Sequence, residues 1–260
     1  MEFEIIFSIV IPFIGTILGS ALIFIFKKLN DNILRAFSGF AAGVMVAASI
    51  FSLISPSLEV VGEDMGKLSF IPVVVGLVLG FGFLMLLDKI IPHQHTNSEE
   101  TEGPKANLKK STMTSLAVAL HNLPEGIAVG VVLASSQVEN PSVTLMMALA
   151  LAIGIAVQNF PEGAIVSLSM NSSGVEKKKA FGLGVLSGAV EPLGALLTML
   201  LVNLISPALP YLLSFAAGAM LYVVVEELVP DMSKGEHSHM GTIMFGLGFI
   251  MMLILEVVMG

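Results

Sequence analysis

Residues 113–135 read MTSLAVALHNLPEGIAVGVVLAS, an apolar stretch that is interrupted near its middle by His121, Asn122 and Glu125. A helix needs about 20 apolar residues to cross a bilayer core of roughly 30 Å. Ionisable residues inside such a helix are costly and usually functional. The stretch therefore predicts a membrane-spanning helix with a polar site near its centre.

Comparable apolar runs recur along the whole chain. Of its 260 residues, 55% are hydrophobic and 12% are charged, and the mean hydropathy is +0.92. A soluble domain of this length would carry far more charge on its surface. We expect an all-α polytopic membrane protein that forms a single transmembrane domain over residues 1–260. Its eight transmembrane helices are predicted at about 5–26, 34–54, 68–91, 113–135, 143–170, 180–205, 208–229 and 240–259.

The basic residues predict the orientation of these helices. Eleven of the twelve Lys and Arg residues fall on one side, after spans 1, 3, 5 and 7, and Lys67 alone falls on the other. Cytoplasmic loops are enriched in Lys and Arg. Both termini are therefore expected to be extracytoplasmic, and the polar loop at about 92–112 is expected to be cytoplasmic and mobile. No basic segment precedes the first apolar run, so no cleavable signal peptide is expected.

A repeated hexad marks the predicted site. The fourth span contains His121-Asn122-Leu123-Pro124-Glu125-Gly126, and the fifth contains Gln158-Asn159-Phe160-Pro161-Glu162-Gly163. The first, second and fifth positions of each hexad share one face of a helix. The sixth span adds Glu191 at a similar depth. We expect one layer of polar side chains across three helices.

Three carboxylates, an imidazole and several amides at one depth favour a bound divalent cation. The cation would neutralise carboxylates that are expensive in hydrocarbon. The chain has no cysteine, and imidazole with carboxylate ligands suits zinc, ferrous iron, manganese or cadmium. A structural role for the repeat is the less favoured alternative.

Other polar residues are weaker candidates for a metal pathway. Met45, Ser49 and Ser52 share a face of the second span, where ordinary helix packing is an equal alternative. The His-x-His pairs on the predicted cytoplasmic side are either metal-capturing residues or solvent-exposed histidines without a role. The same two interpretations, pathway residue or solvated charge, apply to the carboxylates near the helix ends. These candidates are His93, His95, His237, His239, Glu59, Glu226, Glu227, Asp88 and Asp231.

Several segments together resemble one family. They are GFAAGVMVAASIFSLISP (39–56), HNLPEGIAVG (121–130), QNFPEG (158–163), EPLGAL (191–196) and AAGAMLYVVVEELVP (216–230). In this order they are similar to the ZIP (Zrt-, Irt-like) family of metal transporters, and to its bacterial GufA-type branch in particular. The resemblance covers essentially all eight spans.

The resemblance implies a 3+2+3 helix arrangement in which spans 1–3 and 6–8 are related by inverted symmetry. It implies transport-site ligands at His121, Asn122, Glu125, Gln158, Asn159, Glu162 and Glu191, with Met45 facing the site and Ser52 toward the outer side. Related bacterial members often have Asp at the position of Asn159, where the carboxylate helps to hold a second metal. We therefore expect one tightly held ion here.

The predicted function is secondary transport of divalent metal, zinc first, into the cytoplasm by alternating access at a midplane site. A metal-gated channel and a metal-dependent intramembrane enzyme are the alternatives. The chain has neither a P-loop signature nor an H-E-x-x-H motif, so we expect neither ATP-driven pumping nor an enzyme. No cofactor is expected beyond the transported metal. The expected partners are metal ions and the lipid bilayer but no nucleic acid, with a homodimer as one candidate assembly, and the expected location is the inner membrane of a prokaryote.

Overall fold

Helices make up nearly all of the described chain. A computed structural model describes residues 2–26, 29–94, 101–106, 108–137, 143–205, 208–235 and 238–260. Two π-helical segments, Ser49–Ile54 and Val224–Leu228, continue α2 and α9 without a break. In these residues the α-helices are α1 Glu2–Ala21, α2 Asp31–Ala48, α3 Ser55–Met65, α4 Phe70–Ile90, α5 Lys110–Gln137, α6 Leu145–Ser172, α7 Lys177–Gly188, α8 Val190–Ile205, α9 Leu209–Val223, α10 Val229–Ser233 and α11 Met240–Met259.

The described residues contain eight helical stretches that are long and apolar enough to cross a membrane, which confirms the all-α polytopic prediction. The second stretch was predicted to end near residue 54, but it extends to Gly62 because α3 continues from the π segment past Pro56. Proline has no N–H to donate to a preceding turn, and a change of hydrogen-bond pattern is a common way to accommodate it.

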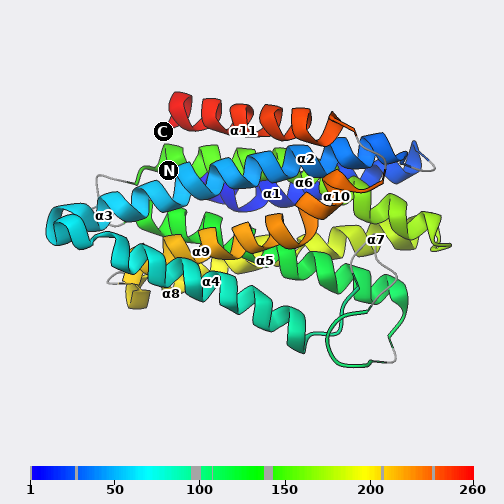
Figure 1. Cartoon of the computed structure of the whole chain (residues 1–260), viewed down its shortest axis with the longest axis horizontal. Helices are drawn as coiled ribbons and strands as arrows, with labels where there is room; N and C mark the ends of the chain where they lie inside the picture. Colours follow the sequence, from blue (N-terminus) through cyan, green and yellow to red (C-terminus); the bar gives the residue numbers. More distant parts are fainter. Residues whose placement is uncertain are drawn as a thin grey trace.

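The long helices run side by side, and the two termini lie at the same end of the bundle (Figure 1). The connection between α4 and α5 lies at the opposite end (Figure 1). The most apolar windows of α5 and α6 are 78% and 72% buried, whereas that of α11 is only 11% buried. The two helices with the repeated hexads therefore form the centre of the bundle, and outer helices such as α11 present their apolar side chains to lipid.

Glycines bring four pairs of helices into close contact. The pairs are α1 with α6, α2 with α11, α4 with α9, and α5 with α8. A Cβ atom on Gly19 would overlap the carbonyl oxygen of Phe160, and one on Gly43 would overlap that of Phe245. Small residues let the backbones of membrane helices approach closely. These glycine contacts fix the depth of each helix against its neighbour, and so the depth of the polar residues on α5, α6 and α8.

Local sequence signals set where two of the central helices begin. Asn30 precedes α2, and its side chain accepts a hydrogen bond of 2.8 Å from the backbone N–H of Ile33. Thr144 caps α6 in the same way through the N–H of Met147. Such caps satisfy backbone donors that have no partner inside the helix.

Candidate metal site

A cluster of polar side chains lies at the centre of the bundle, and we refer to it as the central cluster. Its members are all at most 2% exposed: Thr16 from α1, Asn122 and Glu125 from α5, Gln158 and Asn159 from α6, and Glu191 from the first turn of α8. Five of these six residues were predicted to share one layer of the membrane. The close approach of α8 to α5 explains how Glu191 reaches them, because a Cβ on Gly126 would overlap the backbone of Glu191.

The carboxylate of Glu191 receives three hydrogen bonds. Thr16 Oγ1 and Asn122 Nδ2 donate to Oε1 over 3.1 and 2.9 Å, and Asn159 Nδ2 donates to Oε2 over 2.8 Å. Asn122 and Asn159 also donate to backbone carbonyls, those of Ser187 and Pro12. Three donors stabilise a buried carboxylate without any cation. Glu191 is therefore satisfied by the protein itself.

Glu125 has far fewer donors around it. Its Oε1 accepts one hydrogen bond of 2.5 Å, from Gln158 Nε2. Its Oε2 is buried and accepts no hydrogen bond from any described residue, and the same holds for Gln158 Oε1 and Asn122 Oδ1. A buried acceptor without a donor costs about 1–3 kcal/mol. These three oxygen atoms suit a cation, which would supply the missing contacts to all of them.

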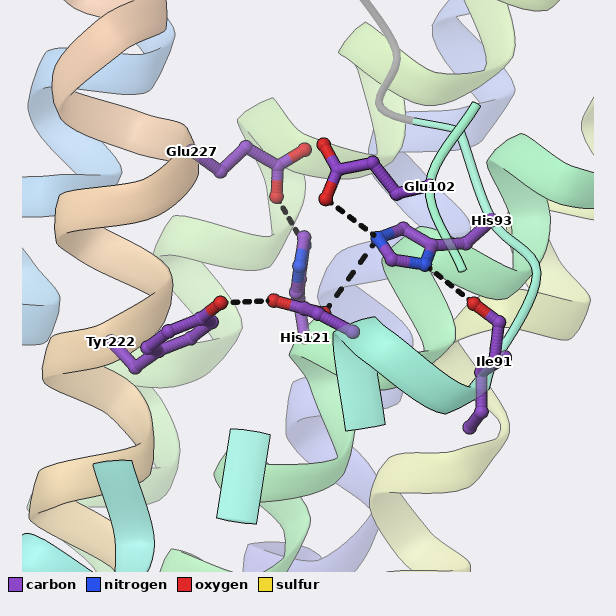
Figure 2. A network of polar contacts seen from close by, with 7 residues as sticks. Ile91, His93, Glu102, His121, Tyr222 and Glu227 are labelled. Carbon is purple, nitrogen blue, oxygen red and sulfur yellow. Dashed lines mark hydrogen bonds and ion pairs between the residues drawn. The ribbon is translucent and has the colours of Figure 1, made fainter. Parts of the chain in front are cut away.

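A second group of side chains lines a small cavity beside the central cluster. The cavity has a volume of 30 Å³, and His121, Glu162, Glu227, Asp231 and Ser38 are among the residues around it. His121 Nδ1 is in contact with Glu227 Oε2 (Figure 2). Glu162 therefore belongs to the group around His121 and Glu227. A volume of this size admits a water molecule or a small ion.

The predicted ligands are thus divided between two adjacent groups. Among the described residues, no three His, Asp or Glu side chains gather in the arrangement of a metal-binding group. The predicted ligands do not converge because His121 contacts Glu227, whereas Glu191 accepts hydrogen bonds from the amides of Asn122 and Asn159. The assignment of His121, Glu125, Gln158 and Glu162 as ligands therefore stays a prediction.

The candidates on the second span, Met45, Ser52 and Glu59, lie in three different environments. Met45 is fully buried in the main hydrophobic cluster. Ser52 lies in the π segment that follows α2 and donates a hydrogen bond of 2.7 Å to Glu256 Oε2 on α11. Glu59 is exposed on α3. Glu256, the ionisable partner of Ser52, was not among the predicted residues.

Of the two alternatives for His93, the solvent-exposed loop histidine is wrong, because its side chain is completely buried. Its Nε2 lies 3.6 Å from Asp88 Oδ1 and 4.0 Å from Glu102 Oε2, and its Nδ1 lies 2.8 Å from the Ile91 carbonyl (Figure 2). Tyr222 donates a hydrogen bond to the other oxygen of Asp88. His93 and Glu102 also pair through their backbones, so this part of the 92–112 segment is held in place.

The remaining candidates on the predicted cytoplasmic side lie in different surroundings. Glu226 and His239 are exposed, at the π segment after α9 and at the start of α11. His95 and His237 lie outside the described residues. The π segment separates the neighbours Glu226 and Glu227, since only Glu227 turns inward to His121.

Thr16, Tyr222 and Glu256 form hydrogen bonds with candidate residues and were missed by the sequence interpretation. A lone threonine, tyrosine or glutamate inside an apolar run has no motif around it. One signal was nevertheless available for Thr16: it precedes Glu191 by 175 residues, the interval that also separates the matching segments Phe40–Met45 and Phe215–Met220. This longer repeat was not recognised, because only the two hexads were compared.

In the described residues, eight membrane-length helices with a buried cluster of carboxylates and amides among them define an integral membrane protein. The family model for the ZIP zinc transporters matches residues 2–112 and 147–256. The chain therefore belongs to the ZIP zinc transporter family, as the sequence motifs predicted.

Curated relatives agree with this assignment over nearly the whole chain. Zinc transporter GufA of Myxococcus xanthus is 36% identical over 251 residues, which cover 95% of both chains. Zinc transporter ZIP11 of Xenopus tropicalis is 33% identical over 316 residues, and the match covers 94% of both chains. Zinc transporter ZIPB of Bordetella bronchiseptica is 35% identical over 250 residues, covering 95% of this chain and 79% of the relative. The predicted GufA-type branch, the membrane location and the prediction of a transporter rather than an enzyme are confirmed by these matches.

Proposed function

We propose that this chain moves divalent transition-metal ions, zinc first among them, into the cytoplasm by alternating access at the central cluster. The names of the family and of the relatives support zinc as the substrate. The direction is supported by the basic residues, which favour placing both termini outside and the α4–α5 connection inside.

The observation that carries the proposal is the shortage of donors around Glu125. Glu125 Oε2, Gln158 Oε1 and Asn122 Oδ1 are buried oxygens without a hydrogen-bond donor among the described residues. They lie beside a cavity whose walls include His121 and Glu162. Oxygen atoms with one imidazole suit zinc and similar ions, and the absence of thiolates suits release after transport.

The contacts of His121 and Glu162 suggest how the ion could be taken up and released. We infer that an arriving ion displaces His121 from Glu227, so that the imidazole and Glu162 turn toward Glu125. The return of His121 to Glu227 would then accompany release. Glu191 would stay satisfied throughout by Thr16, Asn122 and Asn159.

The test is zinc uptake into sealed proteoliposomes that contain the purified protein. We expect saturable uptake by the unmodified chain. Glu125→Gln keeps the size of the side chain and an acceptor for Gln158, but it should reduce uptake at least about tenfold because it removes the charge that offsets the cation. Glu176→Gln is the matched control, since Glu176 is exposed just before α7 and is not a candidate residue, and it should transport normally.

Two outcomes would contradict the proposal. Uptake that rises linearly with zinc concentration, without saturation, would favour a channel over a carrier. Equal uptake by Glu125→Gln and the unmodified protein, at equal reconstituted amounts, would remove Glu125 from the transport site.

A further inference from the structure

A cavity with charged walls lies where the start of α2 meets α10 and the segment that follows it. Its volume is about 270 Å³, whereas a water molecule in the liquid occupies about 30 Å³, so a group of several non-hydrogen atoms fits inside. We refer to it as the charged cavity. The residues that line it are Asp31, Leu34, Arg35, Asp231, Lys234 and Gly235. Of these, only Asp231 also lines the small cavity beside His121.

The side chain of Arg35 lines the charged cavity and is only 8% exposed. Its Nε donates a hydrogen bond of 2.7 Å to the carbonyl of Lys234, and its Nη1 donates one of 3.3 Å to Asn32 Oδ1. Its Nη2 lies against the backbone of Gly235, where an added Cβ would approach it to 2.6 Å. Arginine has five N–H groups in a fixed fork. Since no described residue accepts a hydrogen bond from Nη2, the guanidinium has donors left for a ligand.

No carboxylate of the described residues forms an ion pair with Arg35. Asp31 lies four residues earlier on α2, and opposite charges at this spacing are neighbours on one face of a helix. Here Arg35 reaches toward the segment after α10 instead, and Asp31 remains exposed. A buried charge without a counter-charge is costly. The guanidinium therefore calls for an anion from outside the chain.

The other charged residues of the cavity limit which anion fits. Lys234 supplies a second cation, whereas Asp31 and Asp231 supply two carboxylates. A ligand with negative charge alone would be attracted by the basic residues and repelled by both acids. A ligand that carries an anion and a cation close together would complement all four side chains.

The place of the cavity in the bundle suggests the source of such a ligand. α11 ends with the C-terminus, so its start lies at the end of the bundle that bears the α4–α5 connection (Figure 1). Apolar residues close to the cavity in sequence are exposed: Ile33 on α2 is 40% exposed, and Met240 and Ile243 on α11 are 40% and 58% exposed. In a membrane such side chains meet acyl chains. Basic pockets between transmembrane helices on the cytoplasmic side can bind lipid headgroups.

We propose that the charged cavity binds the headgroup of a phospholipid whose phosphate is linked to a primary ammonium group, as in phosphatidylethanolamine. Arg35 and Lys234 bind the phosphate, because the planar guanidinium matches two phosphate oxygens. Asp31 and Asp231 accept hydrogen bonds from the ammonium group. The bound headgroup joins the start of α2 to the segment after α10. This site involves no transported metal and does not depend on the proposed transport function.

The test measures lipid binding to the purified protein in detergent by native mass spectrometry, with phospholipids that share the same acyl chains. One phosphatidylethanolamine should bind about tenfold more tightly than phosphatidylcholine, whose methylated nitrogen has no N–H for the carboxylates. It should also bind about tenfold more tightly than phosphatidylglycerol, which has the phosphate but no cation. Soluble glycerophosphoethanolamine, which has the headgroup without acyl chains, should bind at least about 100-fold more weakly.

Two variants each remove one partner of the headgroup. Arg35→Gln should weaken the binding of phosphatidylethanolamine at least about tenfold. Because Arg35 also holds the Lys234 carbonyl, Asp31→Asn at an exposed position separates loss of the ligand from loss of the fold. Asp31→Asn should reduce the preference for phosphatidylethanolamine over phosphatidylglycerol to about twofold or less. Glu176→Gln and Lys178→Gln, exposed at the start of α7, are the controls and should change neither quantity.

Three outcomes would overturn the proposal. The first is equal binding of the three phospholipids by the unmodified protein. The second is an unchanged lipid preference in Asp31→Asn protein that elutes as folded. The third is equally tight binding of soluble glycerophosphoethanolamine, which would assign the charged cavity to a soluble phosphodiester rather than to a membrane lipid.

Discussion

Asn159 donates a hydrogen bond from Nδ2 to Glu191 Oε2 over 2.8 Å, at a place where an aspartate could only repel that carboxylate. The amide thus does part of what a second cation would do, since it brings a partial positive charge to Glu191. Thr16 and Asn122 complete the same role on the other oxygen.

Asn159→Asp should convert the site from one tightly bound ion to two. The substitution removes a donor to Glu191 and adds a negative charge beside it. The added charge offsets the repulsion between two bound divalent ions, so binding of the second ion becomes favourable. Metal analysis of purified protein should give about one zinc per chain before the change and about two after it. Asn171→Asp, near the end of the same helix, is the control and should leave one. Two equally tight ions in the unmodified chain would contradict this interpretation.

Thr16→Val should weaken the central cluster without changing its shape. The hydroxyl of Thr16 is a buried donor to Glu191, and loss of such a bond to a charged group costs about 1.5–3 kcal/mol. Thermal unfolding in detergent should show a midpoint several degrees lower, while Thr16→Ser, which keeps the hydroxyl, should stay close to the unmodified protein. An unchanged midpoint in Thr16→Val would show that Glu191 does not depend on this donor.

His93 and His239 should respond differently to removal. His93→Ala empties a buried position next to Asp88, so the unfolding midpoint should fall by about 2–4 °C for each kcal/mol lost. His239→Ala should leave the midpoint unchanged, because that side chain is exposed. Removal of His93, His95, His237 and His239 together should alter the rate of uptake but leave substantial transport, since the central cluster contains none of them. Complete loss of uptake by a folded quadruple variant would show that these histidines are essential for transport and would contradict the prediction.

Topology can be tested with single cysteines because the chain has none of its own. Lys105→Cys lies in the exposed connection between α4 and α5, and Gly260→Cys lies at the C-terminus. A membrane-impermeant thiol reagent added to intact cells should label the second and not the first. Labelling of both from the same side would contradict the predicted orientation.

Gly43→Ala and Gly62→Ala form a matched pair on one span. At Gly43 a Cβ would overlap the backbone of Phe245, whereas at Gly62 it would meet nothing within 4 Å. Alanine favours a helix over glycine by about 1 kcal/mol, so the second variant should be as stable as the parent or slightly more so. The first should yield little folded protein by size-exclusion chromatography. Equal yields of both would mean that α2 and α11 can separate at no cost.

The helix count and the central layer of polar residues could be predicted because both depend on local patterns. The length of an apolar run sets a span, and the helix period places Asn122 and Glu125 on one face. The second span was predicted too short because its continuation past Pro56 depends on a π turn that no local rule gives.

Other features depend on contacts between distant segments. The burial of His93 follows from how the segment after α4 folds back toward Asp88, and a His-x-His pattern does not contain that information. Thr16 and Glu256 each contact a residue on another helix more than 170 positions away. Single polar residues of this kind become recognisable from sequence only when the two halves of the chain are compared with each other.

The closest glycine contacts also group the long helices into pairs. The six residues of the central cluster come from α1, α5, α6 and α8, which are held together as the pairs α1–α6 and α5–α8. The polar residues outside the cluster come from the spans joined in the other two pairs, α2–α11 and α4–α9: Ser52, Asp88, Tyr222, Glu227 and Glu256. On the proposed transport by alternating access, a cation held by the central cluster would stay with these four helices while they move against α2–α11 and α4–α9. A covalent link within a glycine pair should then leave transport intact, whereas a link between the two sets of pairs should stop it.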